Sequence, residues 1–232
     1  MLQRKLVATS RKDCPTLLEE MALFEQGYCF VAGLDEAGRG CLAGPVVAAA
    51  VLLPLHEPPG DILERFAGVN DSKQLTAPMR ARLYDTIMRE AVAVGVGIGS
   101  VTLIDERNIL QATKWAMCTA LQELSPQPQA LLLDALLLSN ITLPQRSIIK
   151  GDARCLSIAA ASIVAKVTRD RLMRQLHDAY PAYGFAQHKG YGSAAHLAAL
   201  QKYGVTPHHR RSFKPVREML FGLFSDAAEK DS

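Results

Sequence analysis

The sequence predicts an α/β fold in which helices flank a mixed central sheet. Apolar segments with the composition of strands alternate with segments of helical periodicity along the 232 residues, as they do in α/β domains. The first two predicted strands are joined by a short glycine-rich link, which is typical of an antiparallel hairpin. The chain length fits one large domain with a small appendage.

The first elements are a short helix and the two strands of the hairpin. Residues 15–26 are expected to be helical, because Pro15 suits a first-turn position and two glutamates follow it near the positive helix end. An apolar strand is expected at 30–34, and a second, valine-rich strand at 45–53. Glycines at 38, 40 and 44 punctuate the link between them.

Two longer helices and a third strand follow. Thr76 has the side chain of a helix N-cap, and apolar residues recur behind it at helical spacing. Residues 92–101 have the β-branched composition of a strand, interrupted by three glycines. Asp105 is expected to cap a helix that ends near Leu124. Trp115 lies among the alanines of this helix and is expected in the core.

The remaining elements complete the sheet and add a C-terminal extension. An apolar strand at 130–134 ends in a carboxylate, and a short strand is expected at 147–150. The longest helix is expected at 157–177, and Asp170 within it should form a structural ion pair with neighbouring arginines. A final helix is expected at 194–203, before a basic tail.

Composition argues against a membrane protein and a zinc protein. The longest apolar run, Val46 to Leu53, is too short to span a bilayer. No apolar signal-peptide core follows the N-terminus, so we expect a cytoplasmic protein. The five cysteines are scattered singly without a C-x-x-C pair, which predicts reduced, small, buried side chains rather than a metal site.

Charge is distributed unevenly along the chain. From Arg146 onward there are 14 Lys and Arg against 7 Asp and Glu, whereas residues 1–145 have 12 against 16. A basic C-terminal part suggests a polyanionic partner. On charge alone, a solvated helix face is the better interpretation.

Four carboxylates form the main candidate site. Asp35 and Glu36 end the first predicted strand, Asp134 ends the strand at 130–134, and Asp152 follows the next strand. Carboxylates gathered in one crevice repel one another and raise their own pKa values unless cations neutralise them. They are also the oxygen ligands that Mg²⁺ and Mn²⁺ prefer, and two such ions can hydrolyse a phosphodiester. Adjacent strand residues face opposite ways, so we expect the strand to turn at Asp35 and Glu36.

The glycine-rich link allows two interpretations. Gly38, Gly40 and Ala43 match the dinucleotide-binding pattern G-x-G-x-x-A after a strand. That pattern requires a following helix, and the segment after Pro45 fits a strand better. The alternative is close approach of the backbone to a nucleic-acid sugar and phosphate, with the Arg39 guanidinium nearby.

A series of collinear motifs resembles bacterial ribonuclease HII, the type 2 ribonuclease H. The similarity begins with DEAGRG at 35–40 and AGPVV at 43–47, and continues with NDSKQL at 70–75 and KGD at 150–152. It ends with AAASIVAKVTRD at 159–170, HKGYG at 188–192 and HRRSF at 209–213. The resemblance covers roughly residues 31 to 216.

The resemblance implies a ribonuclease H-like fold and an endoribonuclease that hydrolyses the RNA strand of RNA–DNA hybrids. It also implies nicking at single ribonucleotides in duplex DNA, with 5′-phosphate and 3′-hydroxyl products and two Mn²⁺ or Mg²⁺ ions. We therefore expect an N-terminal helical extension at 1–27, a catalytic core at 28–180, and a helical, basic segment at 181–232 packed on the core. A monomer is expected, and the tail from Ser225 lacks the motif of a sliding-clamp ligand. A catalytically inactive hybrid-binding module is the alternative.

By the same resemblance, Asp35, Glu36, Asp134 and Asp152 correspond to the metal-binding catalytic acids. Gly38, Arg39 and Gly40 correspond to the backbone grip on the ribonucleotide, and Tyr191 to the tyrosine that reads the 2′-hydroxyl. That hydroxyl is what distinguishes RNA from DNA.

Four further points carry expectations. Lys73 and Lys189 are candidate phosphate contacts. The segment 208–211, His-His-Arg-Arg, is either a DNA-backbone contact or a solvated tail. Ala135 stands where many family members have glycine, and we expect it to be tolerated in ordinary strand geometry.

Overall fold

The computed structural model describes residues 14–228, and its centre is a five-stranded mixed sheet in the order β3-β2-β1-β4-β5. β1 pairs antiparallel with β2, which pairs antiparallel with β3, so the hairpin predicted from the glycine-rich link is confirmed. β1 also pairs parallel with β4, and β4 with β5. The strand bounds are β1 Val31–Ala37, β2 Val46–Leu52, β3 Ala93–Gly99, β4 Ala130–Asp134 and β5 Gln145–Ile148.

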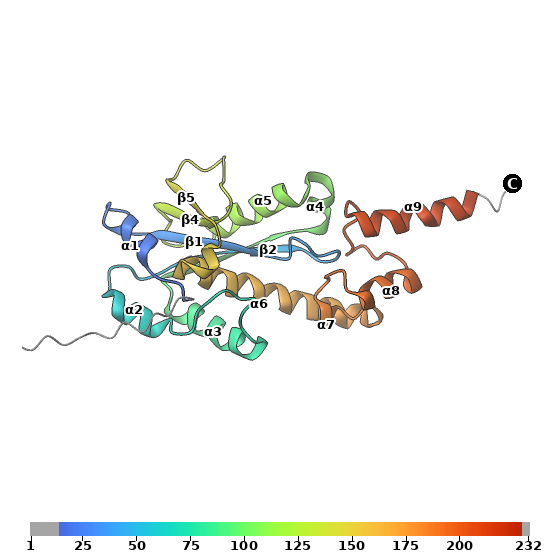
Figure 1. The fold of residues 1–232 in the computed structure, drawn as a ribbon. Helices are drawn as coiled ribbons and strands as arrows, with labels where there is room; N and C mark the ends of the chain where they lie inside the picture. The colour runs from blue at the N-terminus through green and yellow to red at the C-terminus, as the bar shows by residue number, and fades with distance from the viewer. Residues whose placement is uncertain (1–13, 229–232) are drawn as a thin grey trace, which may run out of the picture.

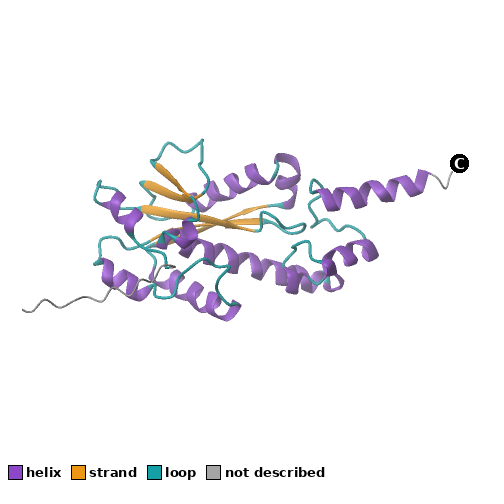
Figure 2. Ribbon diagram, in the orientation of Figure 1, coloured by secondary structure: helices purple, strands orange, loops and turns teal. Residues whose placement is uncertain are grey.

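Helices cover both faces of this sheet (Figures 1 and 2). α4 and α5 lie on one face, and α6 lies on the other with α2 and α3 outside it. α7, α8 and α9 gather beyond one end of the sheet. The bounds are α1 Leu18–Phe24, α2 Pro59–Arg65, α3 Ala77–Glu90, α4 Val101–Arg107, α5 Ile109–Gln122, α6 Leu156–Ala179, α7 Phe185–His188, α8 Ala194–Tyr203 and α9 Lys214–Ala228, with short 3₁₀ turns η1 Gly151–Ala153 and η2 Pro181–Tyr183.

Two apolar cores sandwich the sheet, and glycines allow the helices to approach it closely. Alternate residues of β1 face α6 and α5, as Val31 and Leu34 illustrate. A Cβ at Gly97 would overlap the Ala116 carbonyl of α5, and one at Gly33 would overlap Ser157 of α6. The glycines that interrupt the third predicted strand are therefore points of close helix–strand packing.

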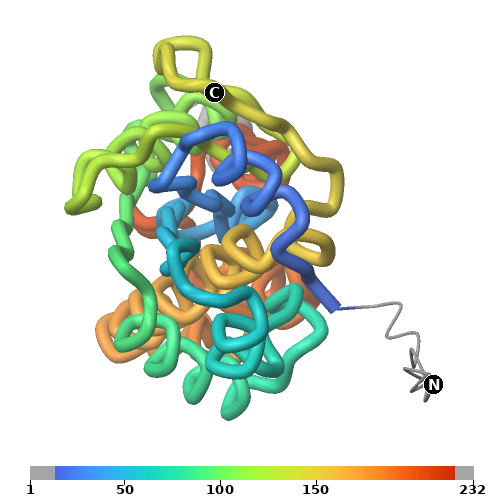
Figure 3. The backbone as a smooth tube through the Cα atoms, turned by 90° about the vertical axis from the view of Figure 1, so that its left-hand side faces the viewer, coloured from blue at the N-terminus to red at the C-terminus, as the bar shows by residue number. Residues whose placement is uncertain are grey.

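A third apolar cluster joins the C-terminal segment to the second half of α6. Met173 of α6 packs in it with Leu42, Phe185, Leu200 and Val216. At the other end of the molecule, the chain around Thr16 runs beside the start of α6, where Thr16 forms an isolated bridge with Cys155 (Figure 3). Among residues 14–228, no helix is both long and apolar enough to cross a membrane.

The single helix expected from Asp105 to Leu124 is wrong. Ser100 caps α4 and Asn108 caps α5, each accepting a hydrogen bond from a backbone amide three residues later. Asn108 has φ +70°, which breaks the helical path between the two. Asp105 instead accepts hydrogen bonds from the backbone amides of Arg211 and Ser212, at 3.0 and 2.9 Å.

Two other expectations on side-chain burial are also wrong. Trp115 is 51% exposed, because the alanines of α5 that flank it in sequence face the sheet and turn it outward. Of the five cysteines, only Cys41 and Cys155 are buried, whereas Cys14 and Cys29 are exposed. The N-cap at Thr76 is confirmed, since its side chain accepts a hydrogen bond from the amide of Met79.

Candidate functional site

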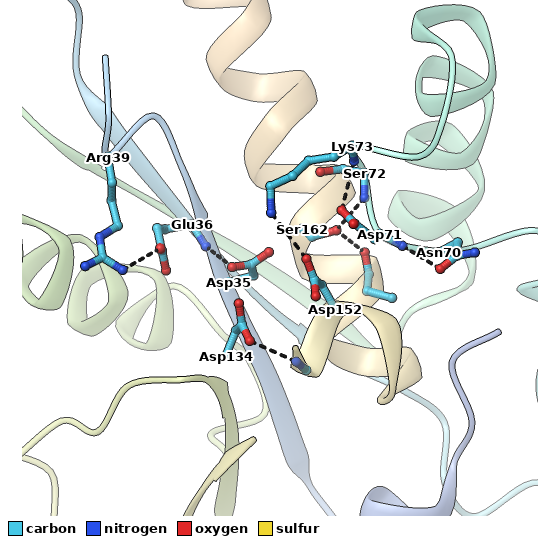
Figure 4. Close-up of polar contacts among 12 residues, drawn as sticks. Asp35, Glu36, Arg39, Asn70, Asp71, Ser72, Lys73, Asp134, Asp152 and Ser162 are labelled. Carbon is cyan, nitrogen blue, oxygen red and sulfur yellow. Dashed lines mark hydrogen bonds and ion pairs between the residues drawn. The ribbon is translucent and has the colours of Figure 1, made fainter. Parts of the chain in front are cut away.

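The carboxylates gather where β1 and β4 end side by side. β1 and β4 are parallel and pair up to Leu34 and Leu133, so Asp35 and Asp134 follow at the same edge. Asp152 lies in the η1 turn after β5. In Figure 4 the carboxylates of Asp35, Asp134 and Asp152 are turned toward a common space, and Glu36 lies beside it facing Arg39.

A cavity of about 220 Å³ adjoins this cluster. It brings together three of the four predicted acids with most of the predicted substrate contacts. Asp152 does not line it but is within reach of Lys73, whereas Lys189 lines a neighbouring cavity between α3, α6 and α7. The cavity is lined by Asp35, Glu36, Ala37, Gly38, Arg39, Gly40, Ser72, Lys73, Asp134, Lys166 and Tyr191.

Burial and nearby charges raise the pKa values of Asp35, Glu36 and Asp152. Asp35 is 5% exposed, and desolvation together with the charges of Glu36, Asp134 and Asp152 raises its pKa well above the usual range. Desolvation also raises the pKa of Glu36, which the nearby Arg39 partly offsets. Burial and the charge of Asp71 raise the pKa of Asp152. A cation bound beside these three carboxylates would favour their ionised form.

The turn expected at Asp35 and Glu36 is wrong. β1 remains paired with β2 through Ala37, with Glu36 opposite Ala48. The chain turns only at Gly38, where φ is +96°, a value that glycine adopts without strain. Glu36 lines the cavity from the last paired residues of the strand, and its Oε1 accepts a hydrogen bond from Arg39 Nη1 at 3.1 Å.

Asp134 is held by the turn that carries Asp152. Its Oδ1 accepts a hydrogen bond from the backbone amide of Gly151 at 2.8 Å. The next residue, Ala135, has φ +48°, so the expectation of ordinary strand geometry there is wrong. This left-handed conformation is one that glycine adopts freely and alanine adopts at a cost.

Lys73 supplies a cation to the cluster. Its Nζ lies 3.4 Å from Asp152 Oδ2. Burial lowers the pKa of Lys73, but Asp152, Asp71 and Asp35 outweigh that effect and raise it. The loop is fixed to α6 because the Ser72 amide donates to Ser162 Oγ at 3.3 Å. Lys73 is therefore placed by its loop.

The donor set fits a divalent cation, although it is not yet assembled around one. Glu36 Oε2 is buried and, among the described residues, has no hydrogen-bond partner. Such an atom is costly unless a cation or donor reaches it. Within residues 14–228, no three acidic, histidine or cysteine side chains already stand in metal-binding geometry. Arg39 and Lys73 are the cations at the cluster in this structure.

Tyr191 lines the same cavity as Asp35, Glu36 and Asp134. Its side chain is 46% exposed, and its hydroxyl interacts with the buried thiol of Cys41. Burial and the adjacent Cys41 raise the pKa of Tyr191, so it is a neutral hydrogen-bonding group at ordinary pH. Lys189 turns elsewhere, since its Nζ donates to the carbonyl of Ala186.

Both interpretations of the segment 208–211 are wrong for its middle residues. His209 and Arg210 are 1% and 0% exposed, so neither belongs to a solvated tail or a surface contact. Arg210 instead donates to backbone carbonyls of the glycine-rich link. The structural ion pair expected for Asp170 is confirmed, but its partners are Lys166 at 2.7 Å and Arg80 at 4.0 Å rather than the adjacent arginines.

The fold contradicts the interpretation of the glycine-rich link as a dinucleotide-binding motif. The segment after the link is β2, a fully buried strand. The link is therefore not followed by the helix N-terminus that would receive a pyrophosphate.

The family model and the similar proteins identify the same family. The sequence model of the family described as Ribonuclease HII matches residues 32–216. The ribonuclease HII of Chloroflexus aurantiacus is 55% identical over 210 residues, covering 90% of this chain and 98% of its own. That of Bacillus cereus strain Q1 is 54% identical over 203 residues, covering 87% and 75%.

Solved structures show the same fold. Ribonuclease H2 of Pyrococcus horikoshii has a TM-score of 0.65 at 30% identity, covering 82% of this chain and 96% of its own. The ribonuclease HII of Archaeoglobus fulgidus, solved in complex with PCNA, has a TM-score of 0.67 at 28% identity, covering 80% and 95%. The predicted ribonuclease H-like fold is confirmed.

Proposed function

The chain belongs to the ribonuclease HII family, endonucleases that hydrolyse the RNA strand of RNA–DNA hybrids, and from that premise we propose that Asp35, Glu36, Asp134 and Asp152 are its catalytic acids. The observation that carries the proposal is the convergence of these four side chains from β1, β4 and η1 at one edge of the sheet. The raised pKa values of Asp35, Glu36 and Asp152 support a site in which these carboxylates share cations.

We propose that the cofactor is a pair of Mn²⁺ or Mg²⁺ ions held by these carboxylates. When bound, such ions supply an activated water and stabilise the departing oxygen of the phosphodiester. The unpartnered Glu36 Oε2 supports a cation ligand at that position. Asp134 is kept in place by the amide of Gly151, and Asp35 by its place at the end of a buried strand.

The remaining cavity residues fit the substrate. Gly38, Arg39 and Gly40 expose backbone to the cavity that the acids line, and Lys73 adds an ammonium suited to a phosphate. Tyr191 offers a flat ring and a neutral hydroxyl to the ribose at an RNA–DNA junction. Lys189, Arg80 and Lys166 line the neighbouring cavity, which suits the continuing nucleic-acid backbone.

The proposed substrates are RNA–DNA hybrids and duplex DNA that contains a single ribonucleotide, cut to leave 5′-phosphate and 3′-hydroxyl ends. We propose that the protein acts as a monomer in the cytoplasm. The sequence of its tail gives no reason to propose a sliding-clamp partner, although one structural relative was solved with PCNA.

A single nicking assay tests this function. The full chain is incubated with a labelled duplex containing one ribonucleotide, with Mn²⁺, with Mg²⁺, or with a chelator. We expect a nick on the 5′ side of the ribonucleotide with either ion and none with the chelator. An uncut duplex in the presence of both ions would show that the chain only binds hybrids.

A further inference from the structure

Arg210 is a buried cation that donates hydrogen bonds to three backbone carbonyls. It is 0% exposed. Its Nη2 donates to the carbonyl of Gly38 at 2.7 Å, its Nη1 to that of Arg39 at 2.8 Å, and its Nε to that of Gly44 at 3.0 Å. One planar guanidinium therefore holds three carbonyls of the glycine-rich link from inside the protein.

These bonds also fix where the amides of the link point. In a trans peptide the carbonyl and the following N–H point in opposite directions. The carbonyls of Gly38 and Arg39 face the buried Arg210, so the N–H groups of Arg39 and Gly40 face away from it. Among the hydrogen bonds of residues 14–228, neither amide has an acceptor. Both residues are exposed and line the cavity beside the acids.

Arg169 does the same for the next stretch of the link. It is 1% exposed and donates to the carbonyls of Ala43 at 3.0 Å and Pro45 at 2.9 Å. Its Nη1 also donates to the carbonyl of Lys189 at 2.9 Å, two residues before Tyr191. Arg169 thus fixes the link and the Tyr191 loop to each other.

Neither guanidinium is neutralised by an acid. In the described part of the chain, no ion pair joins Arg169 or Arg210 to a carboxylate. Burial is costly enough to lower the pKa of Arg210 to about 10, and the residue remains charged at neutral pH. The N–H groups of Arg39 and Gly40 point outward, and the positive charges of Arg210 and Arg169 are buried behind them. This arrangement suits an anionic or strongly polar oxygen of a ligand.

We propose that Arg210 and Arg169 are positioning residues that present the amides of Arg39 and Gly40 to the ribonucleotide and hold that surface in register with Tyr191. The proposal rests on the function proposed above. In this account, two side chains far from the link in sequence orient the backbone groups of the link that contact the ribonucleotide. Neither arginine touches the substrate.

The first test replaces each arginine by lysine, which keeps the charge but loses the planar fork. For Arg210→Lys and Arg169→Lys we expect KM for the single-ribonucleotide duplex to rise about tenfold, with kcat within about threefold of wild type, because the carboxylates are unchanged. A purely structural defect would lower the active fraction, and hence kcat, without raising KM.

The matched control is Glu20→Gln, a buried polar change at the opposite end of the molecule. Glu20 is 0% exposed and accepts hydrogen bonds from the Ser157 amide and hydroxyl. We expect it to lower the melting temperature without changing KM. If a folded arginine variant keeps the wild-type KM, or if Glu20→Gln raises KM equally, the proposal is overturned.

A second measurement uses the wild-type chain and does not depend on the variants folding. Residue-resolved amide exchange is recorded by NMR with and without an uncut RNA–DNA hybrid, in chelator. We expect the amides of Arg39 and Gly40 to exchange rapidly in the free protein and to slow about tenfold or more when the hybrid binds. Binding without this protection contradicts the proposal. A wild-type chain that binds hybrid and protects these amides but never nicks would overturn the proposed function alone.

Discussion

Nζ of Lys73 lies 3.4 Å from Oδ2 of Asp152, so the loop before α3 brings a cation to the acidic cluster. This ammonium therefore lies beside the carboxylates that we propose act on the scissile phosphate. The side chain remains 77% exposed and is free to move from the carboxylate to a phosphate.

Replacing Lys73 by methionine should weaken binding of hybrids by about threefold to tenfold, since one phosphate contact is lost. The slope of log affinity against log salt should fall by about one. Both are measured by fluorescence anisotropy in chelator over a salt series. Lys114→Met on α5, on the opposite face of the sheet, is the control and should change neither. An unchanged salt slope for Lys73→Met would remove Lys73 from the substrate interface.

The carboxylate positions could be predicted because apolar strands that end in acids have a local signature. Asp35 and Asp134 lie at the sheet edge where that pattern put them. The role of Arg210 could not be predicted in this way, because its partners are 171 and 172 residues away in sequence. Two adjacent arginines in a polar stretch are typical of a protein surface, yet the fold buries Arg210 and leaves only Arg211 exposed. The sequence signal available was its place in the HRRSF motif.

Helix boundaries failed for a different reason. The helical pattern read from Asp105 to about Leu124 conceals the break at Asn108. Asn tolerates left-handed φ and can also cap a helix, so one residue both ends α4 and begins α5. Asp105 resembles a cap in sequence but is used by a long-range contact with Ser212.

Tyr191→Phe should separate junction recognition from general cleavage. The variant keeps the ring but loses the hydroxyl. We expect a drop in kcat/KM of about tenfold on the single-ribonucleotide duplex and a smaller drop on a uniform hybrid, because a lost hydrogen bond costs about 1 kcal/mol. Tyr191→Ala should show a larger selective loss. Equal losses on both substrates would indicate a general structural role for this residue.

Ala135→Gly should stabilise the protein relative to an ordinary alanine-to-glycine change. Ala135 is exposed and has φ +48°, which costs alanine about 1–2 kcal/mol. Ala81→Gly, at an exposed position within α3, is the control and should cost about 1 kcal/mol. In urea unfolding, the free energy of unfolding of Ala135→Gly should exceed that of Ala81→Gly and should at least equal that of wild type. The reverse order would show that Ala135 is not strained.

Acid should destabilise the fold through His209, a buried histidine of the C-terminal segment. Burial and the neighbouring His196 lower the pKa of His209 to about 4, whereas its unfolded value is near 6.5. The unfolded chain therefore binds more protons between these values. The stabilising contribution of neutral His209 is complete above pH 6.5 and is lost as the pH falls toward 4.

About 2 kcal/mol of this contribution is lost by pH 5. Asp35, Glu36, Asp152 and Glu20 have raised pKa values and act with the opposite sign, stabilising the fold in acid. The test is therefore a comparison of wild type with His209→Gln in urea at pH 7 and pH 5. The variant should lose less stability between the two than wild type does. Equal losses would exclude His209 as a source of the acid sensitivity.

The most direct test of the acidic cluster is Asp134→Asn. The asparagine carbonyl can still accept the hydrogen bond from Gly151, so the turn is retained while one charge is removed. With Mn²⁺ and a single-ribonucleotide duplex, we expect nicking to fall at least about 10³-fold, equivalent to about 4 kcal/mol of transition-state stabilisation. Hybrid binding in chelator should stay within about twofold of wild type, because the substrate contacts lie elsewhere. An Asp134→Asn variant that nicks at the wild-type rate would contradict the assignment of this cluster as the catalytic centre.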